Sequence, residues 1–169
     1  MIEEIEQFKN ILDYSIYQIS NFGAVKNTKT GRILKNCVDS HGYCHVRLCK
    51  NGKAENFKIH KIVSKYYCSN PNNSNIVDHI DGDRLNNNYK NLRFCTLSQN
   101  NMNSKKRKNT SSVYKGISYN KNANKWCAQI AINSKDIFIG YFISENEAAK
   151  AYNEKVIELF KDFAKLNII

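Results

Sequence analysis

The chain has 169 residues and a net charge of +11, from 26 Lys and Arg against 15 Asp and Glu. No apolar run approaches the ~18 residues that a membrane span needs, and the first twelve residues are acidic and amphipathic, unlike a secretory signal. We therefore expect a soluble, intracellular protein with no membrane contact. The excess of positive charge favours a polyanionic partner such as nucleic acid.

The positive charge is concentrated in two blocks, residues 31–70 and 101–111, which flank a neutral segment. Scattered lysines are typical of a solvated surface. Two blocks on either side of one segment favour contact with a DNA backbone instead.

The first part of the chain is predicted to be a small β-rich unit over residues 1–55. Short strands are expected over residues 15–19, 24–26, 32–35, 43–49 and 54–59. Asn51-Gly52 predicts a type I′ hairpin turn between the last two strands, because both residues tolerate positive φ values. The unit is too small for a large core of its own and is expected to pack on the next segment of the chain.

Six cysteines occur without a CxxC pair, so neither a zinc ribbon nor a disulfide framework is indicated. His41, Cys44, His45 and Cys49 include zinc-binding residue types. However, alternation along residues 43–49 would point Cys44 and His45 to opposite faces of a strand. We expect no zinc, and reduced thiols of which several are buried.

From Ile59 the hydrophobic period changes to that of a helix, with Ile59, Ile62, Val63, Tyr66 and Tyr67 on one stripe. His60, Lys61 and Lys65 would lie near the opposite side. His60 could contact a phosphate or make a local hydrogen bond, and both interpretations stay open.

Residues 77–101 carry the candidate chemistry. A strand is predicted over residues 75–79, a turn at residues 81–83 and a second strand over residues 91–95. Thr96 and Gln99 form a capping box, which predicts the start of a helix that carries Asn100. Asp78 can hold a divalent cation through a hard oxygen, and the adjacent His79 can deprotonate a water molecule.

Two simpler interpretations compete at this segment. Asp81-Gly82-Asp83 could indicate a calcium loop, but the EF-hand pattern needs a Glu at its twelfth position, which this segment lacks. Asp78 could cap a turn and His79 could be a hydrogen-bonded core histidine. The spacing of the carboxamides downstream favours the catalytic interpretation.

The segment resembles the HNH homing endonucleases, in the variant whose last histidine is replaced by asparagine. The resemblance covers roughly residues 57–104 and lies in Asp78-His79, Asn91-Leu92-Arg93 and Asn100. It implies that Asp78 and Asn100 ligate one Mg²⁺ or Mn²⁺ ion, that His79 is the general base, and that Asn91 steadies the loop or the histidine. Since a single site of this kind meets one scissile phosphate, a monomer is expected to nick one DNA strand.

The amino-terminal unit resembles the small modular DNA-binding motif that often precedes this nuclease type. The resemblance lies in residues 17–25 and in Gly42-Tyr43. The chain departs from it at Phe8, where an early tryptophan is common, and at Ala24, where an arginine often follows the glycine. A packing role is therefore expected of this unit more than specific DNA contacts.

Residues 105–112 form a predicted basic linker that contacts DNA and resembles a nuclear localisation run, which leaves a nuclear location open for a eukaryotic host. Together with the flanking segments it supplies the candidate DNA-contacting residues. These are Lys58, Lys61, Lys65, Arg84, Arg93, Lys105, Lys106, Arg107, Lys108, Lys115, Tyr119, Lys121 and Lys125.

Residues 113–169 are predicted to form three strands, over residues 113–119, 126–132 and 137–142, followed by a helix. Ser144 and Glu147 form a second capping box, and the helical stripe is Ala148, Tyr152, Val156, Leu159 and Phe163. This part of the chain resembles the Apetala and ethylene-response-factor DNA-binding domain at Tyr114-Lys115-Gly116-Ile117 and at residues 125–128, 139–142 and 147–152. Trp126 could contact DNA or belong to the core, and the core is favoured.

The sequence thus predicts an α+β fold with four segments: the β-rich unit over 1–55, a ββα-metal nuclease over 56–104, the linker, and a three-stranded antiparallel sheet packed on one helix over 113–169. The expected function is a metal-dependent DNA endonuclease that nicks double-stranded DNA. The alternative is a non-catalytic, sequence-specific DNA-binding regulator on a nuclease-derived scaffold. For the enzyme, we expect a chain without residues 105–169 to keep weak, unselective nicking.

Overall fold

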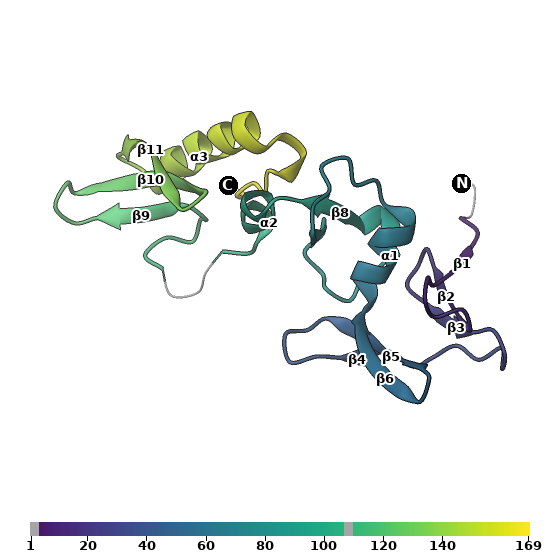
Figure 1. Ribbon diagram of the computed structural model, residues 1–169. Coiled ribbons are helices and arrows are strands. Elements are labelled where there is room, and N and C mark those ends of the chain that lie inside the picture. The colour runs from purple at the N-terminus through teal and green to yellow at the C-terminus, as the bar shows by residue number, and fades with distance from the viewer. Residues whose placement is uncertain (1–3, 107–109) are drawn as a thin grey trace. The chain divides into compact units, whose positions relative to one another are not determined.

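The computed structural model describes residues 4–106 and 110–169. It is a mixed fold of small antiparallel sheets and a few helices (Figure 1). The chain divides into two compact units, residues 1–95 and residues 96–169. The segment predicted as the nuclease, residues 56–104, therefore contributes to both units.

Two three-stranded sheets build the first part of unit 1. Their strands are β1 (Phe8–Asn10), β2 (Tyr17–Ser20) and β3 (Val25–Asn27) in one sheet, and β4 (Cys37–Val38), β5 (Cys44–Lys50) and β6 (Lys53–Lys58) in the other. Asn51 and Gly52 both have positive φ, 52° and 76°, which confirms the predicted hairpin turn. The strand predicted over residues 32–35 is wrong, since that stretch makes only an isolated bridge between Lys26 and Ile33.

The β-rich part shares its core with helix α1 (Ile59–Tyr67), which confirms that it packs on the segment after it. Strand β5 alternates as predicted, with Cys44, Val46 and Leu48 buried. The other fully buried side chains of this core are Ile19, Val25, Ile59 and Val63. Burial of these apolar groups is the main stabilising term for unit 1.

The candidate catalytic hairpin completes unit 1. Strand β7 (Ile76–His79) pairs with β8 (Leu92–Cys95) in antiparallel register, so that Asp78 lies opposite Arg93 and His79 lies opposite Leu92. The connection runs through a loop and the short 3-10 helix η1 (Tyr89–Asn91).

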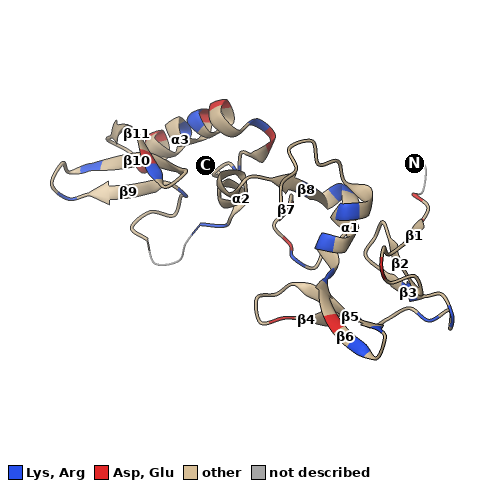
Figure 2. Ribbon diagram, viewed as in Figure 1, with Lys and Arg blue, Asp and Glu red and all other residues tan. Residues whose placement is uncertain are grey.

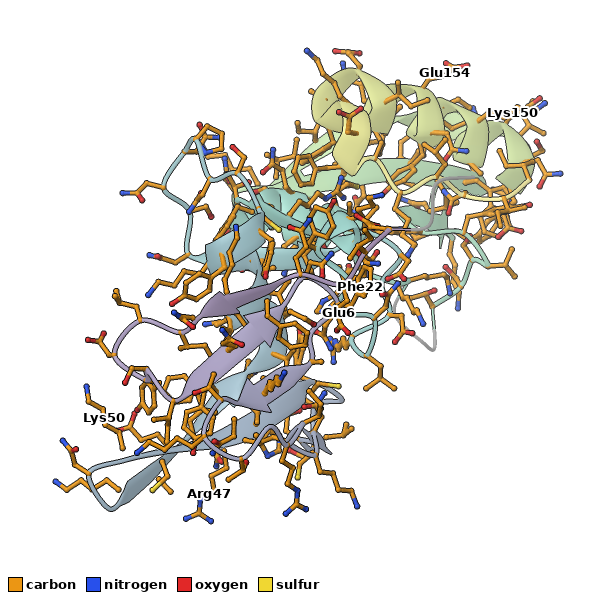
Figure 3. The ribbon with its side chains drawn as sticks, turned by 90° about the vertical axis from the view of Figure 1, so that its right-hand side faces the viewer. Glu6, Phe22, Arg47, Lys50, Lys150 and Glu154 are labelled. Carbon is orange, nitrogen blue, oxygen red and sulfur yellow. The ribbon has the colours of Figure 1, made fainter. Side chains whose placement is uncertain are left out.

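Unit 2 begins with helix α2 (Leu97–Asn103) and continues with an antiparallel sheet in the order β11-β10-β9. Its elements are β9 (Ile117–Asn120), β10 (Lys125–Ile132), β11 (Lys135–Phe142), α3 (Glu145–Phe160) and η2 (Lys161–Phe163). Helix α3 covers one face of the sheet, and Lys150 and Glu154 project from its outer side (Figure 3). The predicted three strands and one helix are confirmed, although the first strand begins at Ile117 and not at residue 113.

Both predicted capping boxes are present, at Thr96 with Gln99 and at Ser144 with Glu147. The predicted stripe of α3 is correct at Ala148, Tyr152 and Val156 but wrong at Leu159, which is exposed while Phe160 is buried. Trp126 is half-buried against this core, in agreement with the favoured interpretation.

All six cysteines are free, and Cys44, Cys95 and Cys127 are buried, as predicted. Among the described residues, no helix is long and apolar enough to cross a membrane.

Candidate active site

Asp78 and His79 stand at the end of β7, and both are only 5% exposed. The buried carboxylate of Asp78 accepts hydrogen bonds from Arg93 Nε at 3.0 Å and Nη2 at 2.9 Å. A buried carboxylate needs such a partner, because an unpaired charge away from water is costly. The cross-strand position of Arg93 follows from the hairpin register, so this pair is set within the hairpin itself.

The imidazole of His79 lies in an aromatic enclosure. Its ring centroid is 5.1 Å from that of His60, in an edge-to-face arrangement, and 6.1 Å from that of Tyr43. His60 comes from α1 and Tyr43 from the residue before β5, so three separate elements of unit 1 meet at the candidate base. Such packing restricts the orientation of the ring.

Burial lowers the pKa of His79, although the hydrogen bond to Asn87 and the nearby aspartates oppose this shift. The ring is therefore neutral at neutral pH and able to accept a proton. Nε2 lies 3.4 Å from the Oδ1 atom of Asn87, a long hydrogen bond that Asn87 accepts when the proton is on Nε2. In that tautomer Nδ1 is the basic nitrogen.

Asn91 organises the loop that follows β7. Its Nδ2 atom donates to Asp81 Oδ1 and to the carbonyl of Asn86, both at 2.9 Å, and its Oδ1 atom accepts from the Asp81 amide at 3.0 Å. The Asp81 carboxylate belongs to the same hydrogen-bond network, in which it accepts from Asn86 and Asn91. Burial alone would raise its pKa, but bonds from the Asp83 amide, Asn86 and Asn91 lower it overall.

Two candidate DNA-contacting side chains, Lys58 and Arg84, flank Tyr43. Lys58 Nζ lies 4.3 Å and the Arg84 guanidinium carbon 4.6 Å from the Tyr43 ring centroid, and Lys58 also pairs with Asp39 at 3.7 Å. Lys61 and Lys65 are exposed, and Figure 2 shows the basic residues of α1 in blue. These four side chains place positive charge on unit 1, whereas the fifth candidate there, Arg93, is engaged with Asp78.

The remaining candidates belong to unit 2. Asn100 is half-buried on α2, and Lys105, Tyr119, Lys121 and Lys125 are exposed. Lys106 is half-buried, and Arg107 and Lys108 lie outside the described residues. Lys115 donates to backbone carbonyls at the end of α2, a geometry that the sequence did not suggest.

Tyr43 and Asn87 were not among the site residues predicted from the sequence, and His60 was considered there only for a phosphate contact or a local hydrogen bond. His60 was placed near the polar side of its helix, and this is wrong, because it is only 4% exposed. Burial lowers its pKa to about 3, and its Nδ1 atom is the buried side-chain polar atom without a partner among the described residues. Asn87 stands within a run of three asparagines, where no sequence signal singles it out.

The ligands that the resemblance implies, Asp78 and Asn100, both carry oxygen donors. Among the described residues, no three His, Cys, Asp or Glu side chains gather as a metal cluster. Carboxylate and carboxamide oxygens, the donors that Asp78 and Asn100 offer, are the type that Mg²⁺ and Mn²⁺ favour.

Two family models match segments within the first 102 residues of the chain. Residues 61–102 match the family model of the HNH endonucleases. Residues 6–49 match the model described as the NUMOD4 motif. The two models cover the segments in which the sequence resembled a nuclease and its associated DNA-binding motif.

Several phage and viral proteins are similar to this chain. DNA endonuclease I-HmuI of Bacillus phage SP01 is 37% identical over 95 residues, which is 56% of this chain and 55% of that protein. An uncharacterised HNH endonuclease of Acanthamoeba polyphaga mimivirus is 35% identical over 57% of this chain and 29% of its own length. The H-N-H endonuclease F-TflII of Escherichia phage T5 is 33% identical over 55% of this chain and 49% of its own length.

A solved structure, described as DNA binding and cleavage by the HNH homing endonuclease I-HmuI, is similar in fold. It has a TM-score of 0.54 and 37% identity, and the match covers 57% of this chain and 56% of that one. The chain spans about half or less of the length of these curated relatives.

Proposed function

We propose that this chain is a metal-dependent DNA endonuclease of the HNH homing type that nicks one strand. The observation that carries the proposal is the buried Asp78-His79 pair at the end of β7, within the segment that matches the HNH endonuclease model. The similarity to I-HmuI, whose structure is described as binding and cleaving DNA, supports the same activity here.

In this proposal His79 is the general base. Its neutral ring, held by Tyr43 and His60, takes a proton from the water that attacks the scissile phosphate. Asp78 and, by the resemblance, Asn100 supply oxygen ligands for one Mg²⁺ or Mn²⁺ ion. When bound, the ion stabilises negative charge on the phosphate and on the departing oxygen.

In this proposal Arg93 is not a metal ligand. It positions the carboxylate of Asp78, which is the ligand. Its two hydrogen bonds fix the orientation of the carboxylate, and its positive charge compensates the buried negative charge of Asp78. Asn91 holds the loop beside His79 and does not itself take part in proton transfer.

DNA binding is assigned to two basic surfaces. On unit 1 it uses Lys58, Lys61, Lys65 and Arg84. On unit 2 it uses the linker lysines together with Tyr119, Lys121 and Lys125 at the β9–β10 end of the sheet, in keeping with the resemblance to the ethylene-response-factor domain. A monomer with one site meets one scissile phosphate, which is why nicking is expected rather than a double-strand break.

Relaxation of supercoiled plasmid in Mg²⁺ or Mn²⁺ tests this function. We expect the wild-type chain to convert supercoiled plasmid to the nicked form, and His79→Ala to be slower by about 10²- to 10⁴-fold, the usual contribution of a general base. His41→Ala is the matched control, since His41 is an exposed histidine of the same unit.

The outcomes separate the alternatives. Equal relaxation by wild type and His79→Ala excludes His79 as the base. Retarded migration of DNA with wild-type protein, without any nicking in either metal, would instead support a non-catalytic DNA-binding regulator.

A further inference from the structure

Helix α2 has seven residues, and its last carbonyls are satisfied from outside the helix. The Lys115 ammonium, from the loop before β9, donates to the carbonyls of Asn101 at 3.0 Å, Met102 at 2.5 Å and Ser104 at 2.8 Å. The carbonyls at the end of a helix have no partner within it, and a positive charge there also complements the helix dipole.

These three shorter bonds match the donor capacity of Lys115, whose ammonium also lies 3.4 Å from the Ser104 hydroxyl. An ammonium group has three N–H donors, so each of them is assigned to a carbonyl. Burial lowers the pKa of Lys115 to about 8, whereas an ammonium that reached out to a phosphate would remain in solvent. The lysine of the Tyr114-Lys115-Gly116 string is thus placed for a structural contact rather than for DNA.

The flank of α2 is also part of the core of unit 2. Met102 is 4% exposed and packs in the same cluster as Ile117 and Tyr152. The Tyr152 hydroxyl lies 3.6 Å from the Met102 sulfur. Tyr152 is itself held by Gly116, where a Cβ atom would stand 2.0 Å from its ring.

The beginning of α2 is fixed by the turn between β10 and β11. The Ser98 hydroxyl donates to Asn133 Oδ1 at 2.6 Å and accepts from the Asn133 amide at 3.1 Å. The helix is therefore bound at its first turn, on its flank and at its end by residues 113–169.

We propose that residues 113–169 position α2, and with it the metal ligand Asn100, so that this segment supports catalysis as well as DNA binding. Lys115 is a positioning residue in this proposal, acting through the helix. The inference rests on the proposed function, in which Asn100 is a ligand of the divalent ion.

The test compares Mn²⁺ affinity of the full chain with and without the Lys115 donor. Lys115→Met keeps the length and the apolar stem but removes all three bonds. We expect its Mn²⁺ affinity, measured from the free-ion electron paramagnetic resonance signal, to fall by about 10- to 100-fold, as for other residues that support metal ligands. Half-maximal nicking should shift to higher Mn²⁺ concentration by a similar factor, with DNA affinity unchanged.

Three companion variants make the result specific. Lys150→Met removes an exposed lysine from the outer side of α3 and should leave Mn²⁺ affinity unchanged (Figure 3). Asn100→Ala removes the proposed ligand itself. Ser98→Ala removes the tie to Asn133 without touching the core, and should weaken Mn²⁺ binding in the same direction even if Lys115→Met fails to fold.

Wild-type Mn²⁺ affinity in Lys115→Met and Ser98→Ala, together with a loss in Asn100→Ala, would overturn the inference and leave the proposed function intact. Weaker DNA binding of Lys115→Met with unchanged Mn²⁺ affinity would also overturn it, since Lys115 would then be a DNA contact. By contrast, a wild-type chain that neither binds Mn²⁺ nor nicks DNA would refute the proposed function itself.

Discussion

At the scale of single residues, the neighbours of the candidate base His79 determine its protonation state. Two histidines from different elements, His60 and His79, lie edge to face in a buried setting, and burial lowers the pKa of both. Two charged rings at this distance would repel each other. The arrangement is therefore stable only while the rings are neutral, and this condition coincides with the state that a general base requires.

The pair predicts acid sensitivity of unit 1. The pKa of His60 is about 3 in the folded chain against 6.5 for an unperturbed histidine, so the unfolded chain binds more protons between these values. Stability is therefore full above pH 6.5 and falls as the pH drops towards 3, with a slope of up to about 1.4 kcal/mol per pH unit from one group. Urea unfolding at pH 7.5, 6 and 5 measures how the free energy of unfolding depends on pH.

His60→Leu should reduce this slope, and the remaining slope should come largely from His79. His41→Gln, at an exposed position, should leave the slope as in wild type. If His60→Leu and wild type lost the same free energy of unfolding between pH 7.5 and 5, the buried pair would not be the source of the effect.

At the scale of elements, the loop between β7 and η1 depends on one side chain. Asn91 makes three hydrogen bonds to residues of this loop, two with Asp81 and one with Asn86. A rigid loop keeps the Asp81 and Asp83 carboxylates at fixed places beside His79, and both act on its pKa.

Asn91→Ala should loosen the loop and lower the free energy of unfolding by about 1–3 kcal/mol, because three hydrogen bonds are lost. Water can replace part of them, since these bonds are partly exposed. Hydrogen exchange of the Asp81 amide, which donates to Asn91 Oδ1, should accelerate. Asn75→Ala, at an exposed asparagine just before β7, is the control. Unchanged exchange at Asp81 would contradict the assigned role.

The elements also show how much of the fold can be predicted from the sequence. Capping boxes, the Asn-Gly turn and the alternation of β5 rest on local physics, and each is found where it was expected. The short strands β1 and β4 were missed, since two or three residues give no periodicity. His60 was misplaced because a polar residue was assigned to the polar side, whereas its burial depends on Tyr43 and His79, which come from other elements.

The candidate site was predicted only in part, because contacts between elements that are distant in the sequence leave no local pattern. Asp78-His79 and its spacing to Asn91 and Asn100 can be read from the sequence. The pairing of Asp78 with Arg93 follows from a strand register that the sequence did not specify. Nothing in a seven-residue helix indicates that Met102 enters the core of the unit to which the later strands belong.

At the scale of the whole molecule, both units carry Lys and Arg side chains (Figure 2), and in unit 2 these include Lys105 and Lys106 after α2. Polyanion binding of this kind releases counterions, so affinity depends steeply on salt. The sheet of unit 2 also exposes Tyr119, Phe138 and Tyr141, which are 38%, 56% and 46% accessible.

The double variant Lys105→Ala/Lys106→Ala removes both linker lysines that the structure describes. It should weaken binding to all DNA sequences to the same extent. The slope of log affinity against log salt should become shallower by about 2, or about 0.9 for each lost phosphate contact. Fluorescence anisotropy at KCl concentrations from about 50 to about 300 mM measures the slope. Lys150→Ala should keep the wild-type slope, and an unchanged slope in the double variant would remove the linker from the DNA contacts.

The architecture of unit 2 changes the expectation for a shortened chain. From the sequence, removal of residues 105–169 was expected to leave weak nicking. Because Lys115, Tyr152 and Asn133 hold α2, such a chain would also lose the support of the helix that carries Asn100.

Gly116 is one of the residues after the nuclease segment on which the support of α2 depends. Its φ is +77°, and any side chain there would collide with the Tyr152 ring. The residue lies outside the segment that matches the HNH endonuclease model, so a comparison confined to that segment would overlook it. In a genetic screen for inactive alleles, lesions at Gly116 would be grouped with those of the nuclease motif, although the codon lies in what looks like a separate module.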